Sequence, residues 1–357
     1  MRIAQVAPLY ESVPPRMYGG TERVVSYLTE ECVRLGHEVT LFASGDSVTH
    51  AELRAVCPRA LRLEGKKIID PLAYHVRMLE MVAQEAENFD VVHFHVDYLH
   101  FPLTRRQKIA AVTTLHGRLD IGDVHPLYRE FVEMPLVSIS NAQRAPMPWA
   151  NWVATVHHGL PTQLYPLQES PGQYLAFLGR ISPEKRVDRA IEIARRADMP
   201  IRIAAKIDPA DREYFDANIR SLLNHPLVEF IGEIGEREKR DFLGNARALL
   251  FPVDWPEPFG LVMIEAMACG TPVIAWRNGS VPEVIDEGTT GYIVNSIDEA
   301  VRAAEQAECL DRRLCRAVFE ERFSVSRMCA NYLAVYEKLS NREPDMSPGS
   351  DVLSMMA

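Results

Sequence analysis

Short apolar runs alternate with longer amphipathic stretches along the first 160 residues of the chain. The apolar runs have the length of buried strands, and the stretches between them, such as residues 21–35 and 71–87, have the length of helices. This alternation predicts βαβ units and a parallel sheet. The strands expected here are residues 3–8, 38–43, 91–95, 111–116, 136–140 and 152–157.

The same alternation starts again after residue 173. The strands expected in this second series are residues 174–179, 201–205, 228–232, 248–252, 272–275 and 291–294, with helices over 183–196, 210–223, 236–245 and 260–268. Between the two series, residues 160–173 hold three prolines and a glycine and show little periodicity, which is typical of a linker. We therefore expect two parallel-sheet α/β domains with a cleft between them. Ligands of such sheets bind beyond the carboxyl ends of the strands.

The expected domains are residues 1–165 and 166–323, followed by a helix over 324–339. Residues 301–339 as a whole read as helices, and residues 340–357 are polar and turn-rich, so we expect this tail to be disordered.

The overall charge narrows the range of partners. The chain has 357 residues and a formal net charge of −10, and most of the acidic excess lies after residue 165. A general nucleic-acid binder needs an excess of positive charge, so we expect no nucleic-acid partner.

The cysteines and the apolar runs indicate a cytoplasmic protein. Six cysteines are scattered along the chain without a Cys-x-x-Cys pair, which favours a reducing compartment over a zinc or redox site. The first residues lack the apolar core of a signal peptide, and no apolar run reaches the 18 residues that a membrane span needs.

The most informative segment runs from residue 254 to residue 274. A proline-bounded loop carries Glu257, and a helix is expected to begin near Gly260. The first amides of such a helix are unpaired and favour a phosphate or a sugar hydroxyl. Glu257 and Glu265 are eight residues apart, about 80° out of alignment on a helix, so they would grip two parts of one long ligand. The alternative is that a glutamate here serves only as a partner of the helix dipole.

A second segment places two cations between a strand and a helix. Arg180 follows the strand that ends at Gly179, and Lys185 is expected in the first turn of a helix that Ser182 caps. Cations in a first turn oppose the helix dipole unless an anion binds there, and a diphosphate would satisfy both. A pair of solvated surface charges is the alternative.

Two further features give weaker signals. Gly19 and Gly20 precede a helix that Thr21 is expected to cap, an arrangement that suits phosphate or is simply a turn. His116 ends a strand, where an imidazole can contact a sugar hydroxyl or serve only the structure. The remaining histidines near strand ends are His93, His95, His157 and His158. A metal site is the less favoured interpretation for them, because no carboxylate cluster accompanies them.

Several motifs are absent from the sequence. The chain has no Gly-x-Gly, and therefore no dinucleotide fingerprint, and it has no Walker A sequence and no Gly-x-Ser-x-Gly elbow. It also lacks an Asp-x-Asp pair, which commonly holds a metal on a nucleotide diphosphate.

Over residues 1–340 the chain resembles the retaining glycosyltransferases of family 4, which have the GT-B fold. The resemblance is carried by Pro-Glu-Pro-Phe-Gly-Leu-Val-Met-Ile-Glu (256–265), Gly-Arg-Ile-Ser-Pro-Glu-Lys (179–185) and Tyr-Gly-Gly-Thr-Glu-Arg (18–23), in matching order. It implies two Rossmann-like domains, the first for the acceptor and the second for the nucleotide sugar, and a last helix that returns to the first domain.

The resemblance also implies roles for these residues. Arg180 and Lys185 would hold the donor diphosphate and stabilise the leaving group, and Gly19 and Gly20 would approach the same phosphates. Glu265 would hold the ribose.

The donor sugar would be held by residues from both domains. Glu257 would bind its hydroxyls beside the backbone near Phe259, Gly260 and Leu261, and His116 would face it from the first domain.

The expected function is metal-independent, retaining transfer of a hexose from a nucleotide-diphosphate sugar, with UDP-glucose slightly favoured. No cofactor is expected, because fixed cations and helix amides would absorb the charge of the leaving group. The acceptor, which is a small molecule, a lipid or a glycan, would be read by loops over residues 14–18, 97–102 and 118–128. A sugar-nucleotide epimerase and a non-catalytic sugar-nucleotide-binding protein are the alternatives.

Two features depart from this picture or leave it open. Many family members have Gly-x-Gly after the second strand of the second domain, where this chain has Lys206, which either reaches the donor or is a surface cation. Short basic clusters favour a solvated face over membrane association: Arg59, Arg62, Lys66 and Lys67, and then Arg105, Arg106 and Lys108.

Overall fold

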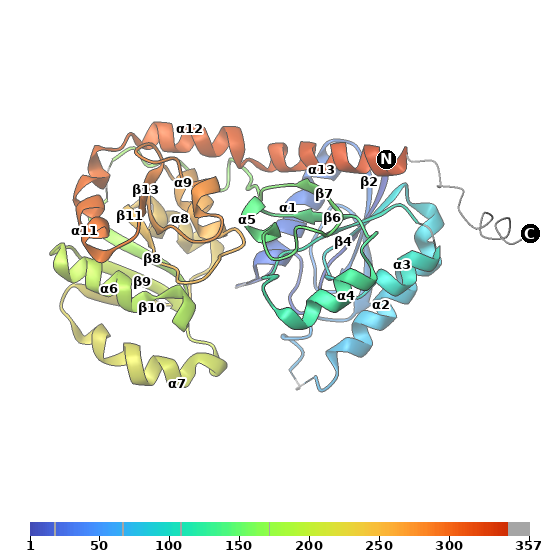
Figure 1. The fold of residues 1–357 in the computed structure, drawn as a ribbon, viewed down its shortest axis with the longest axis horizontal. Helices are drawn as coiled ribbons and strands as arrows, with labels where there is room; N and C mark the ends of the chain where they lie inside the picture. The colour runs from blue at the N-terminus through green and yellow to red at the C-terminus, as the bar shows by residue number, and fades with distance from the viewer. Residues whose placement is uncertain (18, 66–67, 108, 171, 342–357) are drawn as a thin grey trace, which may run out of the picture.

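The computed structural model describes residues 1–17, 19–65, 68–107, 109–170 and 172–341. The chain forms two lobes, each built around a parallel sheet, and two consecutive helices run along one side of both lobes (Figure 1). This is the two-domain α/β architecture that the alternating pattern predicts.

Within the described residues, seven parallel strands form the first sheet in the order β3-β2-β1-β4-β5-β6-β7. They are β1 (Arg2–Val6), β2 (Glu38–Ser44), β3 (Glu52–Cys57), β4 (Val91–Phe94), β5 (Ala111–Thr114), β6 (Leu136–Ser138) and β7 (Trp152–Thr155). The helices of this domain are α1 (Gly20–Arg34), α2 (Pro71–Glu85), α3 (Phe101–Gln107), α4 (His125–Glu130) and α5 (Asn141–Arg144).

The second sheet has six parallel strands in the described part of the chain, in the order β10-β9-β8-β11-β12-β13. They are β8 (Tyr174–Arg180), β9 (Ile201–Lys206), β10 (Val228–Gly232), β11 (Ala246–Phe251), β12 (Val273–Trp276) and β13 (Gly291–Val294). The helices are α6 (Val187–Arg196), α7 (Arg212–Tyr214), α8 (Glu236–Gly244), α9 (Leu261–Ala268), α10 (Val281–Val284), α11 (Ile297–Gln306), α12 (Arg312–Arg322) and α13 (Val325–Ser340).

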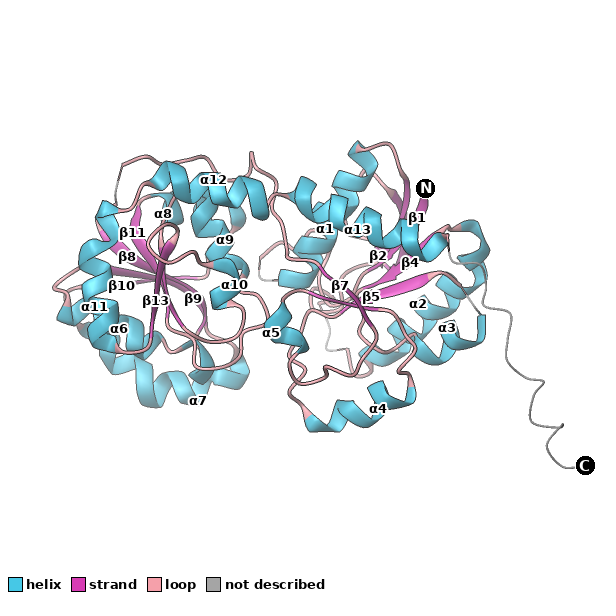
Figure 2. Cartoon of the chain, turned by 45° about the horizontal axis from the view of Figure 1, so that its top comes forward, coloured by secondary structure: helices cyan, strands magenta, loops and turns pink. Residues whose placement is uncertain are grey.

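Helices cover both faces of each sheet (Figure 2). Neighbouring residues of a strand point to opposite faces. In β1, Ile3 packs into the core under α1 and α13, whereas Ala4 packs into the core under α2. In the second domain, Leu249 faces α9 and Leu250 faces α6. Because both faces are buried, these strands read as continuous apolar runs, which is why the pattern located them.

The last helix packs against the first domain. Its most extensive contacts are with α1 and β4, and Tyr332 and Tyr336 are fully buried there. The thiols of Cys32 in α1 and Cys329 in α13 lie 3.4 Å apart. The chain enters α13 beside the linker, where Leu160 and Ser324 form an isolated bridge.

The structure departs from the expected elements in three places. β3 was not predicted, because its exposed edge position allows Glu52 and Arg54 within the strand. The expected helix over 210–223 is broken into short helical turns of different pitch. The helix expected from residue 183 is also broken, since a short 3₁₀ turn (Pro183–Lys185) precedes α6. Of the tail expected to be disordered, residues 340–357, Ser340 belongs to α13, and residues 342–357 lie outside the described residues.

One expected helix cap is wrong, because Gly19, and not Thr21, is the N-cap of α1. Ser182 is the N-cap residue of the 3₁₀ turn, as expected, but its hydroxyl makes no capping hydrogen bond. In the part of the chain that the structure describes, no helix is both long and apolar enough to cross a membrane.

Candidate active site

A cleft of about 770 Å³ lies between the two domains and is lined by residues of both. In the first sheet β1 lies between β2 and β4, and in the second sheet β8 lies between β9 and β11, so the strand order reverses at β1 and at β8. The loops that follow these strands supply much of the lining. Such reversals open a crevice at the carboxyl ends of the strands, where ligands of α/β sheets bind.

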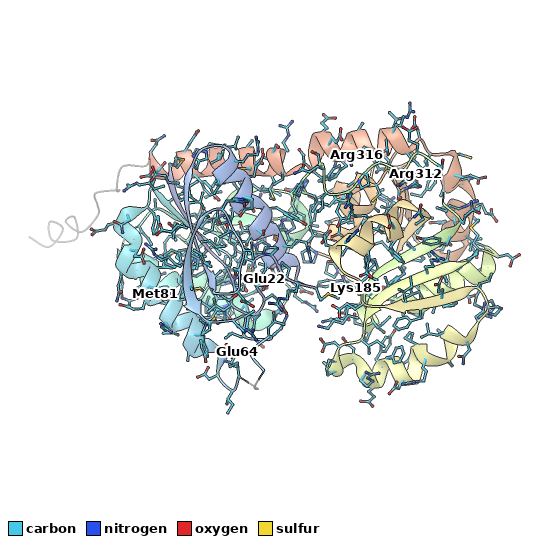
Figure 3. The ribbon with its side chains drawn as sticks, turned by 180° about the vertical axis from the view of Figure 1, so that it is seen from behind. Glu22, Glu64, Met81, Lys185, Arg312 and Arg316 are labelled. Carbon is cyan, nitrogen blue, oxygen red and sulfur yellow. The ribbon has the colours of Figure 1, made fainter. Side chains whose placement is uncertain are left out.

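The structure brings every predicted site residue to this one cleft. The residues are Gly19, Gly20, His116, Arg180, Lys185, Glu257, Phe259, Gly260, Leu261 and Glu265. Figure 3 shows Lys185 on the second domain facing Glu22 of α1 across the space between the domains. Glu22 also lines the cleft, and burial raises the pKa of its carboxyl group.

Lys185 reaches the cleft from the 3₁₀ turn after β8. Arg186 follows with a left-handed backbone (φ 53°), and its guanidinium binds Asp188 and Asp254 at 2.8 and 2.7 Å. This break places Lys185 before α6, so the expected conflict with the helix dipole does not arise. The Lys185 ammonium group instead contacts the Glu257 carboxylate.

The loop that carries Glu257 is held from two sides. The Trp255 indole N–H donates to Glu257 Oε2 at 2.9 Å, and the backbone N–H of Ser280 donates to the Glu257 carbonyl at 3.0 Å. A Cβ on Gly279, which has φ +55°, would lie 2.2 Å from that carbonyl oxygen. Only glycine at position 279 therefore lets the loop between β12 and α10 approach closely enough to support Glu257.

The N-termini of two helices meet across the cleft. α9 starts after Gly260, whose φ of +78° favours glycine, and α1 starts at Gly20. A Cβ on Gly20 would lie 3.6 Å from Leu261 Cδ1, so the two starts are in contact distance. Because the first amides of a helix have no intrahelical acceptor, both ends carry partial positive charge toward the cleft.

Glu265 is buried one turn into α9. Its Oε1 accepts a hydrogen bond from the Lys239 ammonium group at 2.8 Å. Beside it, Glu236 of α8 forms an ion pair with Arg23 of α1, which joins the two domains. No spacing in the sequence points to Lys239, since only the fold brings α8 beside α9.

Arg180 and Lys206 both line the cleft at the ends of β8 and β9. Arg180 pairs with Glu184 at 2.7 Å and Asp211 at 3.2 Å, and Lys206 lies 4.0 Å from Asp208. The cations of the cleft are thus balanced by local carboxylates, which a polyanionic ligand would have to replace.

His116 lines the first-domain side of the cleft. Its Nε2 lies 2.9 Å from His95 Nδ1, and its ring stacks on that of His158 with centroids 5.3 Å apart. Burial lowers the pKa of His116 to about 3, so the ring is neutral at physiological pH. Within the described residues, no group of three or more His, Cys, Asp or Glu side chains is arranged to hold a metal ion.

Two of the three expected acceptor loops contribute to the cleft. Met17 comes from the first loop, and Asp97, Tyr98 and Leu99 come from the second, but no residue of 118–128 lines it. Burial raises the pKa of Asp97 to about 6. That Asp97 has a left-handed backbone (φ 51°) at the end of β4 was not foreseeable from the sequence.

The structure resolves part of the basic clusters. Arg62 lines the cleft and lies 3.3 Å from Glu11, and Arg105 pairs with Glu130 and Glu133. Lys66, Lys67 and Lys108 lie outside the described residues.

Comparisons with known proteins agree with this arrangement. The model "Glycosyltransferase Family 4" matches residues 18–160, and "Glycosyl transferases group 1" matches residues 167–318. An N-acetyl-alpha-D-glucosaminyl L-malate synthase of Bacillus anthracis is 25% identical over 89% of this chain and 93% of that protein. Several other curated relatives match over less than half of their own length.

Solved structures share the whole fold. AviGT4, a glycosyltransferase involved in avilamycin A biosynthesis, superposes with a TM-score of 0.73 at 24% identity, covering 95% of this chain and 98% of its own. Anabaena HepE, solved with UDP-glucose, superposes with a TM-score of 0.71 at 17% identity, covering 95% of this chain and 100% of its own. The chain therefore belongs to the family 4 glycosyltransferases of GT-B fold and is an enzyme that transfers a sugar from a nucleotide-sugar donor.

Proposed function

We propose that the protein is a metal-independent, retaining glycosyltransferase that moves a hexose from a nucleotide-diphosphate sugar, with UDP-glucose as the donor. One observation carries this proposal: two cations and two helix N-termini meet at one cleft between the domains. The UDP-glucose complex of the structural neighbour HepE supports the choice of donor.

The leaving group would be stabilised by fixed charges. Breaking the bond between the sugar and the diphosphate places negative charge on the departing phosphate. Lys185 and Arg180 would bind that charge together with the first amides of α9, and Gly20 would let the α1 backbone approach from the opposite side. Preorganised donors of this kind are worth most in a site from which water is excluded.

When the diphosphate binds, the Lys185 ammonium group would leave the Glu257 carboxylate for a phosphate oxygen. Glu257 would then be available for the hydroxyls of the donor sugar, beside the backbone of Phe259, Gly260 and Leu261. Glu265 would hold the ribose, with Lys239 keeping its carboxylate oriented. His116 would contact the transferred sugar from the first domain.

The acceptor hydroxyl would attack the anomeric carbon on the same face from which the leaving group departs. Attack on that face retains the configuration at the anomeric carbon. Closure of the two domains would exclude water and reduce hydrolysis of the donor. Met17, Asp97, Tyr98 and Leu99 lie on the side of the cleft where the acceptor would enter.

The test is a panel of nucleotide sugars assayed for hydrolysis, followed by acceptor screening with the best donor. NMR of the product gives the configuration of the new bond. We expect UDP-glucose to be the best donor and the product to keep the donor's anomeric configuration. An inverted product, or a donor that is epimerised without transfer, would overturn the proposal.

A further inference from the structure

A chain of buried hydrogen bonds connects His116 to the last helix. His116 Nε2 lies 2.9 Å from His95 Nδ1, and His95 Nε2 lies 2.9 Å from the amide oxygen of Gln5 in β1. The Gln5 amide nitrogen donates to the Tyr336 hydroxyl of α13 at 3.1 Å. Gln5 and Tyr336 are fully buried, and His95 is nearly so.

The direction of these hydrogen bonds follows from the Gln5 amide. Because its NH₂ group donates to Tyr336, its oxygen accepts, so His95 must carry its proton on Nε2. The neutral ring of His95 then has a bare Nδ1, which accepts from His116 Nε2–H. His116 is left with its proton on Nε2 and a bare Nδ1.

The rest of the network holds Tyr336 in place. The Tyr336 hydroxyl lies 2.7 Å from His93 Nδ1, and His93 Nε2 lies 2.7 Å from the hydroxyl of Thr114. Thr114 in turn lies 3.0 Å from the Tyr332 hydroxyl. With this set of hydrogen-bond directions, Tyr336 accepts from Gln5 and donates to His93. Each contact of the network then pairs one donor with one acceptor.

His116 Nδ1 is buried and has no hydrogen-bond partner within the described residues. Native proteins leave a buried acceptor without a partner more readily than a buried N–H group. The orphaned atom therefore agrees with the tautomer that the amide dictates.

We propose that Gln5 and Tyr336 are positioning residues that hold His116, which lines the cleft, in the tautomer with a bare Nδ1. The effect of this tautomer on sugar transfer rests on the proposed function, whereas the tautomer itself does not. The last helix, through Tyr336, thereby takes part in setting the chemistry of the cleft.

The tautomer is tested without any assay of activity. Protein labelled with ¹⁵N-histidine gives two-bond ¹H–¹⁵N correlations that distinguish the two tautomers, and the His116 signals are those lost in His116→Gln. We expect a protonated Nε2 and a bare Nδ1. A protonated Nδ1 in the wild-type protein would overturn the proposal.

Kinetics test the consequence. Tyr336→Phe frees the Gln5 amide to turn over, and Gln5→Met removes it, so each should lower kcat/KM for the donor by about fivefold, the worth of one neutral hydrogen bond. Gln5→Glu, in contrast to Gln5→Met, should keep most of the wild-type activity, because a buried protonated carboxyl group has both an acceptor and a donor.

Tyr174→Phe is the matched control, because it removes a buried hydroxyl that donates to the Phe242 carbonyl at 2.7 Å outside the cleft. If Tyr336→Phe and Gln5→Met match this control, the positioning role is wrong even where the wild type is active. If the wild type transfers no sugar from any donor, the proposed function fails, and the NMR spectra still decide the tautomer.

Discussion

At the scale of single residues, the contact between Lys185 and Glu257 defines the resting state of the site. The two side chains come from loops 72 residues apart in the chain, and the Trp255 indole holds the same carboxylate oxygen. An arginine or lysine near a glycine-rich turn is recognisable in a sequence, but its partner is not. The sequence motifs therefore identify both residues, but only the structure shows that they form an ion pair.

Glu257→Gln should separate nucleotide binding from sugar transfer. In the wild type, a diphosphate competes with the Glu257 carboxylate for Lys185, and the amide removes that competitor. We expect UDP to bind several-fold more tightly by calorimetry, while sugar transfer falls. Weaker binding of UDP to the variant would show that Lys185 does not move from Glu257 to the ligand.

At the scale of elements, the sequence located strands well where both faces are buried. β10 and β13 have the predicted bounds, and the other strands of the second sheet differ by a residue or two at either end. The edge strand β3 was missed because it lacks a continuous apolar run. The break before α6 was missed because ion pairs to Asp188 and Asp254, and not local propensity, hold Arg186 in its left-handed conformation.

The loop between β11 and α9 depends on a glycine that the motif analysis did not single out. Gly279→Ala would place a methyl group against the Glu257 carbonyl at a positive φ. We expect a loss of more than about 1 kcal/mol in the free energy of unfolding, measured with urea, together with a loss of sugar transfer. Gly122→Ala is the control, because no atom lies within 4 Å of the added Cβ.

Equal stability of Gly279→Ala and Gly122→Ala would contradict the close approach that the structure shows.

At the scale of the whole molecule, the acidic second domain would bind an anionic donor through the local cations and helix N-termini of the cleft. From the formal charge of −10 we expected no nucleic-acid partner, but this value gives no information about the charge inside the cleft. In the resting state, carboxylates such as Glu184, Asp211 and Glu257 balance those cations. The composition of a chain reports its average charge, whereas binding depends on the few groups that the fold brings together.

We expect the buried histidines to make the stability of the fold sensitive to acid. Burial lowers the pKa of His100 and His116 to about 3, and it lowers the pKa of His93, His95 and His158 well below the ordinary value of 6.5. The unfolded chain therefore binds more protons below pH 6.5, so stability should fall as the pH falls through this window. Each such histidine contributes up to about 1.4 kcal/mol per pH unit.

Asp97 and Glu22 act in the opposite direction, because burial raises the pKa of Asp97 to about 6 and also raises that of Glu22. Five histidines outweigh these two carboxyl groups, so urea unfolding should show a clear loss of stability between pH 6.5 and pH 5. His100→Gln, away from the cleft lining, should reduce the slope by the contribution of one histidine. A free energy of unfolding that does not change over this range would contradict the assignment of neutral, buried rings.

The central claim is that Lys185, with Arg180 and the start of α9, takes the charge of the leaving diphosphate without a metal ion. The most direct test is the initial rate of UDP-glucose turnover in EDTA for the wild type, Lys185→Ala and the exposed control Lys338→Ala. We expect that EDTA leaves the wild-type rate unchanged, that Lys185→Ala lowers kcat by about 10²-fold or more, and that Lys338→Ala has no effect. Full activity of Lys185→Ala, or a wild-type rate that EDTA abolishes and a divalent cation restores, would contradict it.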